Sequence, residues 1–203
     1  MDSSALDAVD RMMMARCVAL SRKAASEGEY PFACVIVEDG QVVVETTNRV
    51  RRDRDVTRHA ELLAVSEAQR KLGRTKLPRC TLYTTVEPCP MCAFPIREAR
   101  IGRVVYAIRS PLMGGYSRWN ILGDSALSAN MPEVFSEAPK VVAGLLRREA
   151  ETVWWRANWF VWGIIRLRGI FGGRASPAPD LADPLLPPDS QVPADGEAKA
   201  VSR

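Results

Sequence analysis

The chain of 203 residues contains a single histidine, His59, so any role that needs an imidazole falls to one residue. It has five cysteines, and this odd number excludes a framework in which every cysteine is paired within the chain. The charge is not strongly of one sign either. Subtracting 24 Asp and Glu from 28 Lys and Arg leaves a net charge of +4, which permits an anionic partner without requiring one.

Long hydrophobic runs are also missing. No stretch reaches about 18 uninterrupted apolar residues, so no segment is predicted to cross a membrane. The first residues lack the basic segment of a secretory signal, and Asp7 and Asp10 interrupt the stretch after them, so we expect a cytoplasmic protein. Apolar residues make up 47% and charged residues 26%, which excludes a mostly disordered chain, a collagen-like fibre and a disulfide miniprotein.

Hydrophobic periodicity predicts helices and strands that alternate along the chain. The expected order is a helix ending at Gly28, strands over 32–37 and 42–47, a helix over 58–72, a strand over 81–85, a helix over 89–100, strands over 103–108 and 140–143, and a long helix over 145–168. Such alternation favours a layered α/β domain with helices on both faces of one sheet. We expect this domain over 1–170 and a Pro-rich disordered tail over 171–203.

Two short motifs carry the residue types that a catalytic zinc site needs. Residues 59–61 read His-Ala-Glu, and residues 88–92 read Pro-Cys-Pro-Met-Cys. A catalytic zinc takes three ligands from the protein and leaves a fourth position for water. His59, Cys89 and Cys92 supply three ligands, and both motifs fall at predicted helix starts, where the helix dipole favours a metal-binding thiolate. The sequence therefore predicts a Zn²⁺ site.

Glu61 follows the histidine by two residues, about 200° around a helix, so it does not readily chelate the same ion. A free carboxylate beside the fourth position can take a proton from water and pass it to a leaving amine. The pattern H-x-E followed by P-C-x-x-C is typical of zinc-dependent deaminases, and we predict Glu61 as the catalytic residue. The alternative is a closed zinc site without a reaction, which needs a fourth ligand such as Cys17, Cys34 or Cys80.

Around these motifs the chain resembles the cytidine deaminase-like superfamily, and within it the branch of bacterial tRNA adenosine deaminases, guanine deaminases and fungal-type cytosine deaminases. The resemblance extends over about residues 5–165, and its matching stretches are 31–37, Asn48, 55–61, 81–92 and 100–106. It implies a three-layer α/β/α fold with a five-stranded mixed sheet, a homodimer, and hydrolytic removal of an exocyclic amine as ammonia.

The resemblance also implies substrate contacts. Asn48 corresponds to the asparagine that hydrogen-bonds the base ring, and the Ala60 backbone N–H corresponds to a contact with the base edge. Phe32 is placed like the residue that walls the base pocket, although an apolar hairpin residue serves equally well as core. Trp119 lies in the loop 109–122, where relatives shape the substrate pocket, and its ring can stack on a heterocycle or pack internally.

The substrate class is the most open question at this point. The segment 49–58 holds five arginines, but Asp53 and Asp55 dilute them, and a net charge of +4 is low for an RNA-binding protein. We therefore expect a small-molecule substrate, a nucleobase or nucleoside that is a purine such as guanine, or cytosine. The alternative is a tRNA adenosine-to-inosine deaminase acting on the anticodon loop, whose phosphates the arginines would contact. A second alternative is a non-catalytic binding module of deaminase fold, stabilised by zinc.

The last predicted helix has more apolar surface than one sheet contact requires. One stripe, which includes Phe160, can pack on the sheet, and Trp155, Trp159 and Trp162 form a second stripe. We expect a homodimer partner or a loop of this chain to cover the second stripe. The alternative is peripheral contact with an anionic membrane surface, because arginines flank the tryptophans.

Overall fold

The computed structural model describes residues 8–172, and within them five strands form one mixed sheet in the order β2-β1-β3-β4-β5. β1 pairs antiparallel with β2 and β3, whereas β3, β4 and β5 run parallel to one another. The strands are β1 (Ala33–Glu38), β2 (Gln41–Thr47), β3 (Cys80–Val86), β4 (Arg103–Ile108) and β5 (Lys140–Ala143). This topology confirms the predicted α/β fold with a five-stranded mixed sheet.

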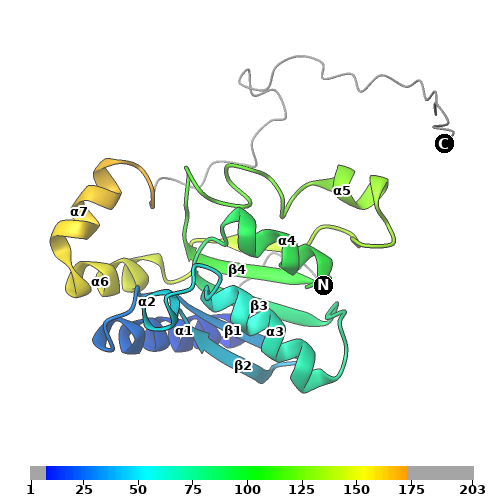
Figure 1. Cartoon of the computed structure of the whole chain (residues 1–203), viewed down its shortest axis with the longest axis horizontal. Coiled ribbons are helices and arrows are strands. Elements are labelled where there is room, and N and C mark those ends of the chain that lie inside the picture. Colours follow the sequence, from blue (N-terminus) through cyan, green and yellow to red (C-terminus); the bar gives the residue numbers. More distant parts are fainter. Residues whose placement is uncertain (1–7, 173–203) are drawn as a thin grey trace, which may run out of the picture.

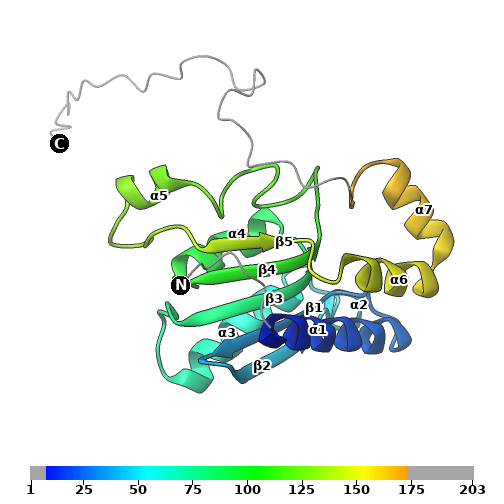
Figure 2. The same cartoon turned by 180° about the vertical axis from the view of Figure 1, so that it is seen from behind.

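Helices cover both faces of the sheet (Figures 1 and 2). On one face lie α3 (Ala60–Leu72) and α4 (Pro90–Glu98), and on the other lie α1 (Ala8–Ser26) and α6 (Arg147–Ala157). Each helix closes one apolar layer against the strands, which gives the three layers predicted for the domain.

The alternation of side chains along β1 explains why the sheet has two cores. Cys34 and Ile36 belong to the cluster beneath α3 and α4, while Val35 and Val37 belong to the cluster beneath α1 and α6. All four side chains are at most 4% exposed. Successive residues of a strand point to opposite faces, and a strand buried on both faces therefore reads as a continuous apolar run.

Two short helices lie in segments that the periodicity left without regular structure. α2 (Val50–Asp53) lies in the arginine-rich segment, and α5 (Ser125–Asn130) follows Asp124, whose carboxylate accepts a hydrogen bond from the Ala126 backbone N–H at 2.8 Å. Helices of four and six residues are too short to produce a detectable apolar period.

The prediction of one long helix over 145–168 is wrong, because the chain breaks at Asn158 into α6 and α7 (Trp159–Leu167). Asn158 has extended backbone angles, φ −163° and ψ 95°, and its side-chain oxygen accepts a hydrogen bond from the Val161 N–H at 3.0 Å. Asparagine competes well with the helical backbone in this way and is a favoured N-cap.

The break also changes which apolar residues of this region are buried. Trp162, assigned by the periodicity to the outer stripe, is only 8% exposed and stacks on Trp154 with ring centroids 5.8 Å apart. Phe160, assigned to the sheet-facing stripe, is 61% exposed. The stripe prediction is therefore wrong at these two positions and at Ile164, which was also assigned to the sheet-facing stripe but is 38% exposed. A new helix axis after Asn158 resets the direction of each later side chain.

The first two residues of the predicted tail contact the domain. Phe171 packs against Trp154 with ring centroids 5.3 Å apart, and the Gly172 N–H donates to the Arg109 carbonyl at 2.8 Å. The remainder of the predicted tail, 173–203, lies outside the described residues. Between residues 8 and 172, no helix combines the length and the apolarity that a bilayer crossing requires.

Candidate metal centre and active site

Two helix N-termini bring the predicted metal ligands together. His59 is the N-cap of α3 and Cys89 is the N-cap of α4, and both have extended backbone angles. Neither side chain caps its own helix, so each is free to turn toward the other motif. Cys92 lies in the first turn of α4, three residues after Cys89. The partial positive charge at a helix N-terminus stabilises the thiolates that a metal needs.

The ligand atoms form a nearly equilateral triangle. The His59 Nδ1 atom lies 3.6 Å from Cys89 Sγ and 3.5 Å from Cys92 Sγ, and the two sulfurs are 3.6 Å apart. Tetrahedral zinc with ordinary bond lengths separates a nitrogen from a sulfur by about 3.6 Å and two sulfurs by about 3.8 Å. The donor set and its spacing therefore fit a zinc ion held by these three side chains.

No fourth protein ligand joins the triangle among residues 8–172, where His59, Cys89 and Cys92 form the whole cluster. Cys34 lies on β1 and is fully buried, but it is not part of this cluster. The closed structural site considered from the sequence has no fourth ligand in the described part of the chain. Three protein ligands with one position left open is the arrangement of catalytic zinc sites.

Glu61 lies beside the cluster without belonging to it. Its Oε2 atom is 3.7 Å from Cys92 Sγ, and its Oε1 atom accepts a hydrogen bond from Thr84 Oγ1 on β3 at 3.3 Å. The side chain is 5% exposed, and burial raises the pKa of this carboxyl above its usual range. A buried acid held at the edge of a metal triangle is positioned to exchange protons with a water at the open position.

The electrostatics of the cluster single out Cys89. Its hydrogen bond with Cys92, together with His59, lowers the pKa of Cys89 to about 4. The same interaction, reinforced by burial, raises the pKa of Cys92 well above its usual range. The bond to Cys89 raises the pKa of His59. The protonation states of the three side chains are therefore coupled. Such coupling is expected for side chains gathered to bind one cation.

Two of the predicted substrate contacts lie next to the start of α3. Ala60 is fully buried, and its carbonyl accepts a hydrogen bond from Thr46 Oγ1 at the end of β2 at 2.7 Å. Asn48 follows β2, is 2% exposed, and donates its side-chain amide to Glu29 Oε2 at 3.0 Å. Their roles toward a base stay predictions.

The other two predicted contacts have different surroundings. Phe32 is half-buried, and its ring packs edge-on against Trp154, with centroids 5.1 Å apart, and against Phe171 at 6.1 Å. Trp119 is 58% exposed, and the guanidinium of Arg118 lies 5.6 Å from its ring centroid. Phe32 therefore joins the apolar contacts of the C-terminal segment, and stacking of Trp119 on a substrate stays a prediction.

Two glutamates that the motifs did not single out organise the loops around the site. Glu29 accepts from the Asn48 amide and, at 2.6 Å, from the backbone N–H of Arg52, so it ties α2 to the predicted base contact. Glu87, two residues before Cys89, is 3% exposed and accepts hydrogen bonds from Ser110, Tyr116 and Ser117. Their partners lie 19 to 30 residues away in the sequence. Glu87 directly precedes the second motif, whereas no sequence pattern pointed to Glu29.

Comparisons with known sequences agree with this geometry. The family model for the cytidine and deoxycytidylate deaminase zinc-binding region matches residues 7–108. The tRNA-specific adenosine deaminase of Agrobacterium fabrum is 35% identical over 133 residues, which are 66% of this chain and 83% of that protein. The chloroplastic tRNA(adenine(34)) deaminase of Arabidopsis thaliana is 37% identical over 111 residues, or 55% of this chain, but the match spans only 8% of that longer protein.

The chain is also similar to solved structures of deaminases. A structure from studies of A-to-I editing by tRNA:A34 deaminases at the wobble position of transfer RNA has a TM-score of 0.57 and 34% identity, covering 70% of this chain and 96% of that chain. The guanine deaminase of Nitrosomonas europaea has a TM-score of 0.59 and 26% identity, covering 76% and 86%. The family match and the ligand triangle with its adjacent buried glutamate agree. The chain therefore belongs to the cytidine and deoxycytidylate deaminase zinc-binding family.

Proposed function

We propose that this protein is a zinc-dependent hydrolase that deaminates adenosine in the anticodon loop of a tRNA. The observation that carries the proposal is the similarity to the tRNA-specific adenosine deaminase of Agrobacterium fabrum, which covers 83% of that protein. This similarity favours the alternative reading of the sequence over the small-molecule substrate that a net charge of +4 led us to expect.

The distribution of charge supports an RNA substrate better than the net charge does. The Arg49 N–H donates to the Arg58 carbonyl at 3.0 Å, which fastens the arginine-rich segment directly before the metal ligand His59. Asp53 forms ion pairs with Arg49 and, less closely, with Arg58. These contacts fix the segment next to the reacting centre, where any unpaired arginine it carries can meet a phosphate backbone.

Not all of these arginines are neutralised. Arg52 and Arg54 are exposed, and no carboxylate in the described part of the chain lies within 4 Å of either guanidinium. Arg54 also ends α2 in a left-handed conformation, with its backbone N–H donating to the Val50 carbonyl. The two side chains are thus carried by a short, hydrogen-bonded turn and are available for phosphate oxygens.

In the proposed reaction water adds to the carbon that bears the exocyclic amine, and the amine leaves as ammonia. A zinc ion bound by the triangle supplies Lewis acidity, which lowers the pKa of water at its open position. Glu61 accepts a proton from the attacking water and passes it to the neighbouring ring nitrogen. It then accepts the second proton, from the hydroxyl group of the tetrahedral intermediate, and passes it to the departing amine, which leaves as ammonia. Thr84 holds the Glu61 carboxylate by its 3.3 Å hydrogen bond, and burial keeps bulk water from competing for these protons.

The test is a substrate panel with the zinc-loaded full chain. Ammonia release is measured for an anticodon stem-loop that carries adenosine, and for free adenosine, guanine and cytosine. We expect turnover on the stem-loop, with an efficiency that falls steeply as salt rises, because phosphate contacts are lost. The pair Arg52→Gln and Arg54→Gln should lower kcat/KM on the stem-loop by about tenfold or more.

The matched control is Arg79→Gln, which changes an exposed arginine that pairs with Asp39 at the distant β1–β2 turn and should leave turnover unchanged. Turnover of guanine or cytosine with none on the stem-loop would contradict the proposal and return the assignment to a small-molecule substrate. Zinc binding without turnover of any substrate would support the non-catalytic binding module instead.

A further inference from the structure

The helix α7 presents an apolar surface to solvent. Trp159, Phe160 and Leu167 are 67%, 61% and 89% exposed, and the exposed positions Gly163 and Ile164 lie between them. At 100° per residue these five positions fall within about 140° of the helix circumference, and none of them is polar. A surface helix ordinarily carries polar residues on its solvent side. We call this surface the apolar arc.

Residues of α7 outside the apolar arc anchor the helix, so the arc faces away from the domain. Trp162 stacks on Trp154, and Arg166 donates to Glu151 at 2.9 Å while its guanidinium lies 5.9 Å from the Trp162 ring centroid. Figure 1 shows α7 at one end of the molecule, joined to α6 and away from the sheet. The contacts with α6 therefore hold the arc outward.

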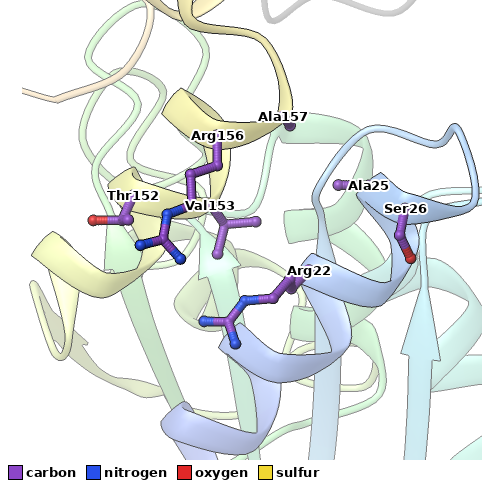
Figure 3. Close-up of a pocket in the computed structure, with 7 residues that line it drawn as sticks. All are labelled: Arg22, Ala25, Ser26, Thr152, Val153, Arg156 and Ala157. Carbon is purple, nitrogen blue, oxygen red and sulfur yellow. The ribbon is translucent and has the colours of Figure 1, made fainter.

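A basic hollow lies between α1 and α6 (Figure 3). Its volume is about 300 Å³, and its lining consists of Arg22, Ala25, Ser26, Thr152, Val153, Arg156 and Ala157. Arg22 from α1 and Arg156 from α6 extend toward this space from the two helices. No acidic residue lines the hollow, and no carboxylate among the described residues lies within 4 Å of either guanidinium. Two unneutralised guanidinium groups facing one space suit an anion with several oxygens, such as a phosphate.

The basic hollow and the apolar arc are neighbours in the fold. Ala157, which lines the hollow, is the last residue of α6, and the arc begins two residues later at Trp159. At the other end of α7, Arg168 is exposed and has no carboxylate within 4 Å in the described range. Apolar side chains with tryptophan and phenylalanine, bordered by free arginines, match the two layers of an anionic membrane surface.

We propose that α6 and α7 form a docking surface for an anionic lipid bilayer. In this arrangement the apolar arc lies at the level of the acyl-chain boundary, and Arg22 and Arg156 bind a lipid phosphate in the basic hollow. The helix α7 has nine residues and therefore lies in the interface without crossing it. The proposal concerns a surface outside the metal centre and does not depend on which substrate is deaminated.

Charge and shape favour a bilayer over two other occupants. A second copy related by two-fold symmetry would set the arc against itself and bring the flanking arginines of both copies near one another without acidic partners. An RNA partner would use the arginines, but it gains little from the aliphatic Ile164 and Leu167 or from an uncharged arc. A bilayer uses both features at once.

The test is flotation of the zinc-loaded full chain with vesicles of phosphatidylcholine alone and with added phosphatidylglycerol. We expect the protein to float with the anionic vesicles, more weakly with the neutral ones, and less in about 0.5 M salt, where surface charges are screened. Leu167→Ser and Trp159→Ser should each lower the partition coefficient about tenfold by removing apolar contact. Arg22→Gln and Arg156→Gln should each lower it about fivefold on anionic vesicles, and by less on neutral vesicles, whose phosphates are balanced by choline.

The matched control is Leu112→Ser, which changes another exposed leucine, 52% accessible, in the loop after β4. It should float like the unchanged protein, and zinc content and circular dichroism should show that every variant is folded. Absence of flotation with anionic vesicles overturns the proposal. A dimer that Leu167→Ser converts to a monomer, without any vesicle binding, assigns the arc to a second copy. Retention by an anticodon stem-loop that Arg22→Gln abolishes, again without flotation, assigns the hollow to RNA.

Discussion

The carboxylate of Glu87 occupies the space that a Cβ atom on Gly114 would need. Four hydrogen bonds hold that carboxylate, from the backbone N–H groups of Ser110, Tyr116 and Ser117 and from the Ser117 hydroxyl. The loop after β4 therefore wraps around a buried acid two residues before a metal ligand. Only glycine at 114 allows so close an approach.

We expect Gly114→Ala to displace this loop, because the Glu87 carboxylate cannot move aside without breaking its hydrogen bonds. Glu87 is only 3% exposed, so water cannot replace those bonds. The free energy of unfolding should fall by about 1–3 kcal/mol, as for other overpacked interiors, and urea denaturation measures it. Gly163→Ala is the control, since a Cβ there meets nothing within 4 Å and the position is helical. That variant should be neutral or more stable by up to about 1 kcal/mol. Equal effects of the two substitutions would refute the close-approach argument.

Glu61→Gln tests the proton-transfer role. The glutamine keeps the size of the side chain and its contact with Thr84, so zinc content should not change. Turnover of the best substrate should fall by about 10²–10⁴-fold, the usual contribution of a positioned acid or base. Glu67→Gln, on the same helix, is the matched control and should retain activity. A Glu61→Gln variant with full turnover would mean that the proton is carried elsewhere.

Removal of the metal should expose a single thiol. Cys17, Cys34 and Cys92 are fully buried and Cys80 is 1% exposed, whereas Cys89 is partly exposed at the start of α4. We expect the zinc-loaded protein to resist iodoacetamide, because a metal-bound sulfur reacts slowly, and the chelator-treated protein to be alkylated first at Cys89. Peptide mapping by mass spectrometry identifies the modified residue. If Cys89 reacts equally fast before and after chelation, it is not a metal ligand in solution.

A buried ion pair fastens α1 to the sheet. Asp10 is 1% exposed, accepts from both terminal nitrogens of Arg103 at 2.5 and 2.8 Å, and also accepts from the Tyr83 hydroxyl at 2.7 Å. Asp10→Ala leaves the guanidinium without this carboxylate and should cost about 3 kcal/mol, the lower end for a broken buried pair because Arg103 retains some exposure.

The control for Asp10 is Glu45→Ala, which breaks the exposed ion pair with Arg16. Exposed pairs contribute about 0–1 kcal/mol, so this variant should remain close to the unchanged protein. Thermal or urea unfolding of both variants under the same conditions provides the comparison. If the two substitutions cost the same, the buried pair gives no more stability than a surface pair.

The sequence alone was sufficient to predict the metal ligands and most strands of the sheet. The predicted strands over 103–108 and 140–143 coincide with β4 and β5, and the two motifs lie at helix starts as expected. These features arise from local patterns, because strand alternation, helix caps and the spacing of two cysteines act over a few residues. The prediction of one long C-terminal helix failed because the apolar period continues across Asn158, whereas the side chain of Asn158 caps a new helix there.

Residue types and their spacing thus determined which atoms bind a metal and which acid remains free beside them. Only the tertiary structure decided that Glu29 fastens Asn48, that Glu87 gathers a loop around itself, and that α7 turns an uncharged surface outward. The physical reason is that these contacts join residues far apart in the sequence. A buried carboxylate accepts hydrogen bonds from whichever N–H groups the folded chain brings within about 3 Å of it. No periodicity along the sequence predicts which groups those are.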